Sequence, residues 1–276
     1  MLTPEQFSKA KSFIYRYGRL LDRKRFAYHF EVGSLNPVVE VLANYQNPDG
    51  GFGNGLELDV MAPASTAVGA ECAMMLLDEL GVVDSKMAEH LESWILSSQQ
   101  ENGALPPMPP DVADYPHGQW WAGSTDETRA LSLAAFLGKW GRGSAHFFER
   151  VYVHFEQLEF PSQQSIFTYP FYLYLRYAPD IPSREQRLNT IREGIPALIE
   201  KEREHYPLFV SYWEHAADEV SRGPLKTQAE RYIAGLEDDG GLKIAYPQLP
   251  WWRPVWTLEG LISLKKHGLL PHDILP

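Results

Sequence analysis

Two acidic residues, Glu57 and Asp59, follow the glycine-rich segment YQNPDGGFGNG (45–55) and are the strongest candidates for catalysis. In an extended segment, side chains two positions apart point to the same side, so these carboxyl groups are expected to lie close together. Two like charges in an apolar opening split their pKa values, which leaves one acid and one base. The structural alternative is that both carboxylates only accept hydrogen bonds from neighbouring loop amides.

Two later segments, DYPHGQWWAGSTDE (114–127) and AYPQLPWWRPVW (245–256), carry further candidates. The candidate acids and bases are Glu57, Asp59, His117, Asp126 and Glu127. The candidate substrate-binding residues are Tyr115, Trp120, Trp121, Tyr246, Trp251, Trp252, Arg253 and Trp256. Each set has a structural alternative, because acids are favoured in the first turn of a helix and tryptophan pairs also pack one repeat against the next.

The glycines of segment 45–55 are expected to form a turn and not a phosphate site. A nucleotide-binding loop needs a strand before its glycines and a helix directly after them. Here a helix is predicted before them, and an irregular stretch follows. Asp49, Gly50 and Gly51 are therefore interpreted as a helix end and turn, where glycine accepts positive φ without steric cost.

Helical periodicity and capping signals predict a mainly α fold. Thr3, Pro4 and Gln6 form a helix start of the Thr-x-x-Gln type. Further helices are predicted at 36–46, 64–80, 85–99, 124–140, 144–157, 184–203, 205–220, 224–236 and 255–267. The segment SIFTYPFYLYLRY (165–177) is rich in strand-forming residues but is also long enough for a helix.

Internal repetition is the strongest organising signal. ANYQNPDGGFG (43–53) is echoed by SSQQENGALPP (97–107), and the same interval separates Gln46 from Gln99 and Gly50 from Gly103. AGLEDDGGLKIAYP (234–247) repeats the turn again. The helix before a turn is amphipathic, as in KMAEHLESWILSSQQ, whereas the helix after it is apolar, as in ECAMMLL and LSLAAFL. These patterns predict outer and inner helices that stack in pairs.

The repeats resemble the Gln-to-Trp motifs of terpenoid cyclases, which share a glutamine, an Asp-Gly-Gly turn and an aromatic residue with QNPDGGF (46–52). The segment PASTA (63–67), which opens an inner helix, is similar to one in those enzymes and in protein prenyltransferase β subunits. YQNPDGGFGNGLE also looks like bacterial proteins of unassigned activity in that superfamily. The resemblance covers about two-thirds of the chain. It implies one all-α domain over residues 1–276, an (α/α) barrel or toroid of roughly five or six helical hairpins with Gly-rich turns around a central cavity.

The catalytic motifs of that superfamily do not carry over to this chain. The Asp-x-Asp-Asp and Asp-Asp-x-x-Asp motifs are absent, and EDDGG (237–241) falls in a repeat turn. Cys72 lacks the neighbouring Asp and His ligands of a prenyltransferase zinc site, so no metal and no cofactor are expected. Three functions stay open: an enzyme acting on an isoprenoid, an intracellular glycan hydrolase or lyase, and a non-catalytic binding scaffold.

Composition excludes several other classes of function. The formal net charge of -11 argues against a nucleic-acid partner, and no run of residues is long and apolar enough for a membrane span. The N-terminal segment is charged throughout and lacks the apolar core of a signal peptide, and a single cysteine rules out an internal disulfide. We therefore expect a cytoplasmic protein with a small-molecule substrate.

Overall fold

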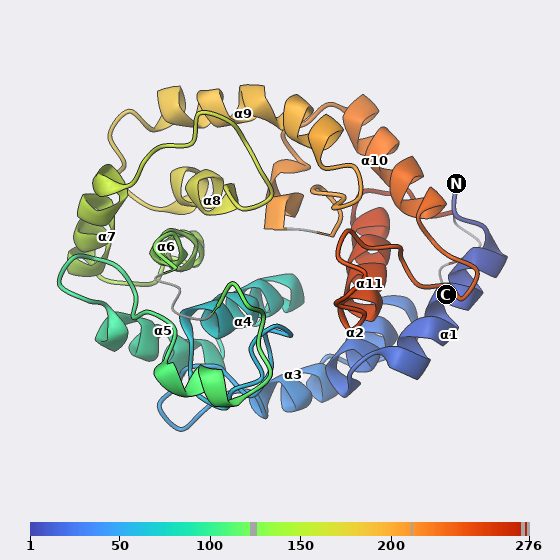
Figure 1. The fold of residues 1–276 in the computed structure, drawn as a ribbon, viewed down its shortest axis with the longest axis horizontal. Coiled ribbons are helices and arrows are strands. Elements are labelled where there is room, and N and C mark those ends of the chain that lie inside the picture. The colour runs from blue at the N-terminus through green and yellow to red at the C-terminus, as the bar shows by residue number, and fades with distance from the viewer. Residues whose placement is uncertain (122–125, 211, 272–273, 275–276) are drawn as a thin grey trace. The chain divides into compact units, whose positions relative to one another are not determined.

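A computed structural model shows a helical protein, as the periodicity predicts (Figure 1). The structure describes residues 1–121, 126–210, 212–271 and 274. Within these ranges the only β-type pairings are isolated bridges. The helices are α1 (Pro4–Tyr17), α2 (Leu20–Phe30), α3 (Asn36–Ala43), α4 (Ala67–Leu80), α5 (Lys86–Ser98), α6 (Arg129–Lys139), α7 (Ala145–Gln157), α8 (Tyr169–Tyr177), α9 (Arg184–Lys201), α10 (Arg222–Ala234) and α11 (Trp252–Lys266). Two short 3-10 helices are η1 (Pro110–Asp114) and η2 (Tyr212–Ala216).

The chain forms two compact units whose boundaries fall within α3 and α9. Unit 1 comprises residues Met1–Val41, Gln163–Phe167 and Arg192–Pro276, and unit 2 comprises Leu42–Ser162 and Thr168–Ile191. In unit 1, α11 packs against α1 and α2. The single (α/α) toroid over residues 1–276 stays a prediction.

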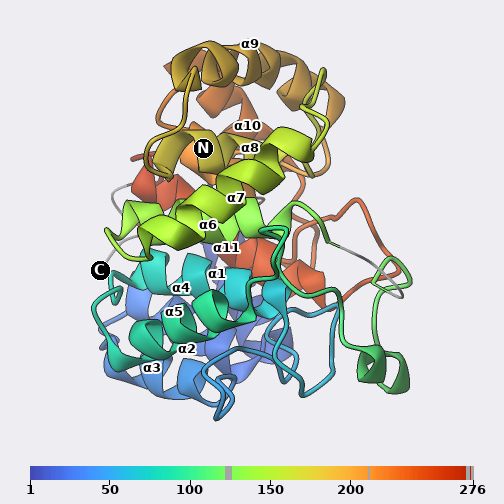
Figure 2. The same cartoon turned by 90° about the vertical axis from the view of Figure 1, so that its left-hand side faces the viewer.

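Unit 2 consists of an inner and an outer layer of helices, as Figures 1 and 2 show. Every residue of α6 from Arg129 to Leu137 is buried, and so is every residue of α8 from Tyr169 to Leu175. The helices α5 and α7 bury only one face each, and they lie outside α4 and α6. The amphipathic and apolar patterns of the sequence therefore separate the two layers correctly within this unit.

The three repeated turns have the same backbone structure. The N–H of Asn47 donates to the carbonyl of Gly51 at 2.8 Å, and the equivalent bonds of the other turns are Gln100 to Ala104 and Glu237 to Gly241, both at 2.9 Å. Gly50, Gly103 and Gly240 have φ values of 93°, 85° and 89°. A side chain is strained at such φ values, so the glycines are explained by the turn itself.

Each turn also docks against an outer helix. The amide of Gln46 donates to the carbonyl of Met87 in α5 at 3.0 Å, and that of Gln99 donates to Phe147 in α7 at 3.2 Å. In the third turn Leu236 takes the place of the glutamine. Gly240 packs on the backbone of Lys9, so the last turn docks on α1.

One sequence prediction about helices is wrong, and one ambiguous segment is resolved. Residues 205–220 do not form an α-helix, and only the 3-10 helix η2 is present among the described residues of that range. Pro207 has no N–H to donate and disfavours a helical conformation at Tyr206, whose φ is +49°. Within the ambiguous segment 165–177, by contrast, Tyr169–Tyr177 is helical.

Candidate functional site

Glu57 and Asp59 lie in a buried loop between the first repeated turn and α4. Their exposed fractions are 5% and 8%. The segment is not extended as the sequence suggested, because the N–H of Val60 donates to the carbonyl of Glu57 and closes a turn. The side chain of Glu57 folds back, and its Oε1 accepts the N–H of Asp59 at 3.4 Å. This turn still keeps the two acidic residues next to each other.

The carboxyl group of Glu57 is a weak acid in this structure. Burial raises its pKa to about 7, and the charge of Asp59 adds to that effect. The thiol of Cys72 in α4 opposes it by donating to Oε2 of Glu57 at 3.0 Å. Close to neutral pH, Glu57 is therefore able both to hold and to release a proton.

A second group of buried polar residues surrounds Arg129, the first residue of α6. Its guanidinium pairs with Glu71 of α4, and its Nε and Nη2 donate to Asp126 at 2.9 and 3.2 Å. The same guanidinium contacts the hydroxyl of Tyr169, which donates to Oε2 of Glu71 at 2.7 Å. Two carboxylates thus share one buried cation, which keeps the guanidinium charged.

Glu71 has an incompletely satisfied carboxyl group. Its side chain is fully buried, and its Oε1 has no hydrogen-bond partner in the structure. Burial raises the pKa of Glu71, and the charge of Arg129 opposes this. A buried acceptor without a partner costs free energy, and the nearby hydroxyl of Ser132 offsets part of this by lowering the pKa of the same carboxyl group.

The two groups form one cluster within unit 2. Glu71 and Cys72 are consecutive in α4, and the positive charge of Arg129 acts to lower the pKa of both Glu57 and Cys72. We call the set the acid cluster: Glu57, Asp59, Glu71, Cys72, Asp126, Arg129 and Tyr169.

Sequence reasoning missed Glu71, Arg129 and Tyr169 as site residues. A signal for the first two was present, because each is a charged residue in the apolar, buried part of an inner helix. A buried charge needs a buried partner, so Glu71 in one inner helix and Arg129 in the next could have been paired. Tyr169 carried no such signal, since tyrosines are numerous in this chain.

Residues 114–121 lie directly against the loop that joins the first repeated turn to α4. We call this loop the first link, residues 114–121 the second link and residues 245–256 the third link. Val60 and His117 form an isolated antiparallel bridge, and the N–H of Gly118 donates to the carbonyl of Asp59 at 2.8 Å. Two of the segments that carry sequence candidates are therefore neighbours within unit 2. Nδ1 of His117 lies 2.8 Å from the carbonyl oxygen of Tyr115, so this histidine is tied to its own loop.

The aromatic residues of the second link differ in exposure. Tyr115 and Trp120 expose 40% and 45% of their surfaces. Trp121 is half-buried and packs against a small apolar cluster that includes Val60 and Val112. Tyr115 and Trp120 thus keep accessible surface, whereas part of Trp121 is buried by its packing against this apolar cluster.

The structure corrects the predicted position of Asp126 and Glu127. They do not lie in the first turn of a helix, because α6 begins at Arg129. Asp126 has a left-handed φ of 43°, which an aspartate tolerates, and its carboxylate is held by Arg129. Glu127 is exposed, and its backbone carbonyl lies 2.6 Å from Nε2 of His154. Asp126 joins the acid cluster, whereas the side chain of Glu127 points to no described partner.

The third link belongs to unit 1. Arg253 binds Asp239 and Glu237 of the third repeated turn and lies over the ring of Phe13, so it stabilises that turn. Trp252 and Trp256 have ring centroids 6.0 Å apart. Tyr246 and Trp256 contact the ring of His205, and Trp251 is 44% exposed.

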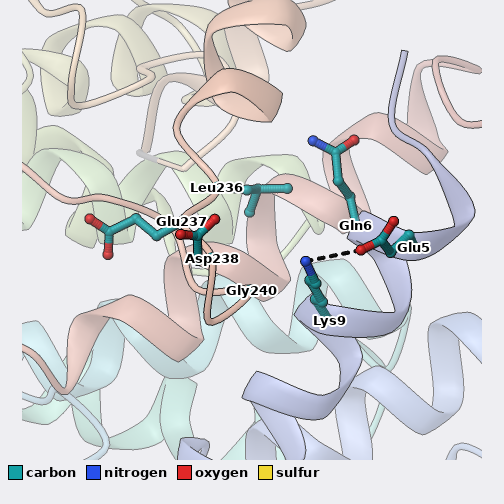
Figure 3. A pocket seen from close by; sticks show the side chains of 7 residues that line it. All are labelled: Glu5, Gln6, Lys9, Leu236, Glu237, Asp238 and Gly240. Carbon is teal, nitrogen blue, oxygen red and sulfur yellow. Dashed lines mark ion pairs between the residues drawn. The ribbon is translucent and has the colours of Figure 1, made fainter.

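A small surface pocket in unit 1 contains none of the predicted site residues (Figure 3). It has a volume of about 210 Å³ and lies between α1 and the third repeated turn. Glu5, Lys9, Glu237 and Asp238 line it, and Lys9 and Glu5 form an ion pair at 3.0 Å. The pocket is a by-product of the docking of this turn on α1.

Comparison with known proteins adds no assignment. No model of a protein family matches the chain, and no curated protein is similar to it in sequence. None of the helices in the described part of the chain is long and apolar enough to cross a membrane. In the same part, no group of three or more His, Cys, Asp or Glu side chains could hold a metal ion.

Proposed function

We propose that this protein is an acid–base enzyme that cleaves a glycosidic bond, with Glu57 as the proton donor. The observation that carries the proposal is the burial of Glu57 beside Asp59, which raises the pKa of Glu57 to about 7. General acids work best when their pKa lies near the working pH. Glycosidases use such a pair, in which one carboxyl group stays protonated and the other is ionised.

The acid strength of Glu57 favours a glycoside over an isoprenoid. A glycosidic oxygen can accept a proton from a weak acid while its bond to carbon breaks. An alkene carbon is a much weaker base, so its protonation needs a stronger acid than a carboxyl group with a pKa near 7. The isoprenoid substrate that the terpenoid cyclase resemblance implies is therefore the alternative to test.

The proposed reaction is a hydrolysis in which the two carboxyl groups have different roles. Glu57 donates its proton to the glycosidic oxygen as the bond from that oxygen to the anomeric carbon breaks. A water molecule attacks the anomeric carbon and transfers a proton to the carboxylate of Asp59. Return of that proton to Glu57 through solvent restores the starting state.

The other members of the acid cluster support these roles. The thiol of Cys72 donates to Oε2 of Glu57, which orients the carboxyl group and stabilises its ionised form. Arg129 and Tyr169 hold Glu71 in place. The free Oε1 of Glu71 is an acceptor for a sugar hydroxyl.

The second link is hydrogen-bonded to the backbone of Asp59 through Gly118, and in this proposal it moves aside to admit the substrate to the buried carboxyl groups. Tyr115 and Trp120 lie on this link and expose aromatic faces on which a sugar ring can stack. The exposed aromatic residues and the buried carboxyl groups therefore lie on two loops that are hydrogen-bonded to each other. Closing such a loop excludes water from the acid during the reaction.

The test is an activity screen with matched variants. The full-length protein is incubated with a panel of oligosaccharides and, separately, with farnesyl diphosphate and squalene, and the products are identified by mass spectrometry. We expect cleavage of at least one oligosaccharide, a loss of at least 100-fold in kcat for Glu57→Gln and Asp59→Asn, and normal activity for Asp111→Asn, an exposed acid in η1. Turnover of the isoprenoids alone, or glycan cleavage that survives Glu57→Gln, contradicts the proposal.

A further inference from the structure

A second group of polar and aromatic residues lies in unit 1, outside the acid cluster. It is centred on His205, which follows α9 in the chain. Nδ1 of His205 lies 2.8 Å from a carboxylate oxygen of Glu202, and both side chains are only 15% exposed. A carboxylate at Nδ1 holds the imidazole in one orientation and keeps the proton on that nitrogen.

The other ring nitrogen of His205 is buried without a hydrogen-bond partner. In the neutral imidazole a proton on Nδ1 leaves Nε2 as an acceptor, and in the protonated form Nε2 is a donor. Neither form finds a protein partner for Nε2 in the structure. A buried polar atom of this kind is costly, and a water molecule or a ligand group that reaches it removes that cost.

Aromatic rings surround this histidine. The ring centroids of Tyr246 and Trp256 lie 5.3 and 6.4 Å from that of His205, and Trp252 lies 6.0 Å from Trp256. All three aromatic residues are partly exposed. Burial, followed by the charge of Glu202, raises the pKa of the Tyr246 hydroxyl, which places that hydroxyl within electrostatic reach of the Glu202–His205 pair.

We propose that His205, Glu202, Tyr246, Trp252 and Trp256 form a binding site for a sugar ring. The partly exposed aromatic faces provide a stacking surface, and Nε2 of His205 binds a hydroxyl group of the ligand. A hydroxyl both donates and accepts, so it satisfies Nε2 in either protonation state of the imidazole. A hydrocarbon ligand offers Nε2 no hydrogen bond in either state, so the site is expected to favour a sugar over an isoprenoid chain.

The site does not depend on the acid cluster, since all of its residues belong to unit 1 and none of them acts on Glu57. Binding there can be measured without turnover. If the glycosidase proposal fails, sugar binding at His205 can still be tested. If no sugar binds at His205, the glycosidase proposal can still be tested.

The experiment records the NMR signals of the His205 ring nitrogens while a ligand is added. The full-length protein is labelled with ¹⁵N-histidine, and long-range ¹H–¹⁵N spectra are recorded during titration with maltotriose, chitobiose and farnesyl diphosphate. The His205 signals are assigned with His205→Phe. We expect one of the two sugars to shift the Nε2 signal of His205, with farnesyl diphosphate leaving it unchanged.

Matched variants separate binding from folding. Glu202→Ala and His205→Phe are each expected to weaken the binding of that sugar by at least tenfold. Glu204→Ala serves as the control, because Glu204 is an exposed neighbour that pairs with Lys243. Circular dichroism checks that each variant is folded. The inference is overturned if neither sugar moves the Nε2 signal, if farnesyl diphosphate moves it, or if folded His205→Phe binds the sugar as tightly as the wild type.

Discussion

The thiol of Cys72 donates a hydrogen bond to Oε2 of Glu57 across 3.0 Å, which links the loop after the first repeated turn to the inner helix α4. Glu57 is buried and Cys72 is half-buried, and loss of contact with water raises the pKa of each. The only cysteine of the chain is therefore a partner that tunes the pKa of Glu57. Its effect on Glu57 can be measured.

Replacing Cys72 with alanine is expected to raise the pKa of Glu57. The thiol stabilises the ionised carboxylate, so its loss favours the protonated form. A hydrogen bond of this kind contributes about 0.5–1.5 kcal/mol, which corresponds to a rise of about 0.4 to 1 pH unit. Carbon-13 NMR of labelled glutamate side chains gives the titration curve. A pKa that stays at the wild-type value shows that this hydrogen bond is not formed in solution.

The burial of Glu57 makes stability fall as the pH rises. Its pKa in the folded state is about 7, above the ordinary value of 4.5, so the folded state holds this proton more tightly than the unfolded state. The favourable contribution is complete below pH 4.5 and is lost as the pH rises through about 7. Over this pH interval, proton linkage lowers the free energy of unfolding by about 3 kcal/mol.

Glu57→Gln removes this pH dependence because it cannot ionise. We expect the variant to be more stable than the wild type at pH 8, by up to about 3 kcal/mol, and to differ little at pH 5. Urea unfolding at the two pH values provides the measurement. Equal loss of stability at both values would falsify the assigned pKa direction.

Removal of Arg129 is expected to destabilise the protein strongly. Arg129→Leu leaves Glu71 and Asp126 in unit 2 without the cation that they share, and breaking a buried pair in this way costs about 3–5 kcal/mol. The matched control is Arg203→Leu, because Arg203 pairs with Glu200 at the surface and such pairs contribute about 0–1 kcal/mol. Similar effects of the two substitutions on thermal unfolding would show that the Arg129 network is not buried.

The docking of the repeated turns predicts a contrast between two glycines. Gly103 and Gly81 have φ values of 85° and 67°, so alanine is strained at both. A Cβ at Gly103 collides with the backbone carbonyl of Arg150 in α7, whereas a Cβ at Gly81 meets no atom within 4 Å. Gly81→Ala is expected to cost about 1 kcal/mol and Gly103→Ala at least twice that. Denaturant unfolding of both variants tests the contrast, and equal costs contradict the docking of the turn on α7.

Local features of this protein could be predicted from sequence because neighbouring residues create them. The turns at Gly50, Gly103 and Gly240 follow from the repeated Asp-Gly and Asn-Gly pairs, and the start of α1 follows from Thr3 and Gln6. The prediction of a helix over residues 205–220 is wrong, because Pro207 and the positive φ of Tyr206 are incompatible with a continuous helix there.

The candidate site was predictable only in part. Glu57 and Asp59 stood out as acids in a glycine-rich loop, and they are buried next to each other. Their partners come from α4, α6 and α8, which are distant in the sequence. The sequence by itself determined the repeated turns, the helical character and the two-layer pattern of unit 2, since hydrophobic periodicity and backbone conformation act locally. Only the tertiary structure decided that Glu57 contacts Cys72 and that Glu71, Asp126 and Tyr169 share Arg129. The packing of the inner helices removes water from these polar groups. Without water, each group is stable only with a hydrogen-bonding or charged partner from a neighbouring element.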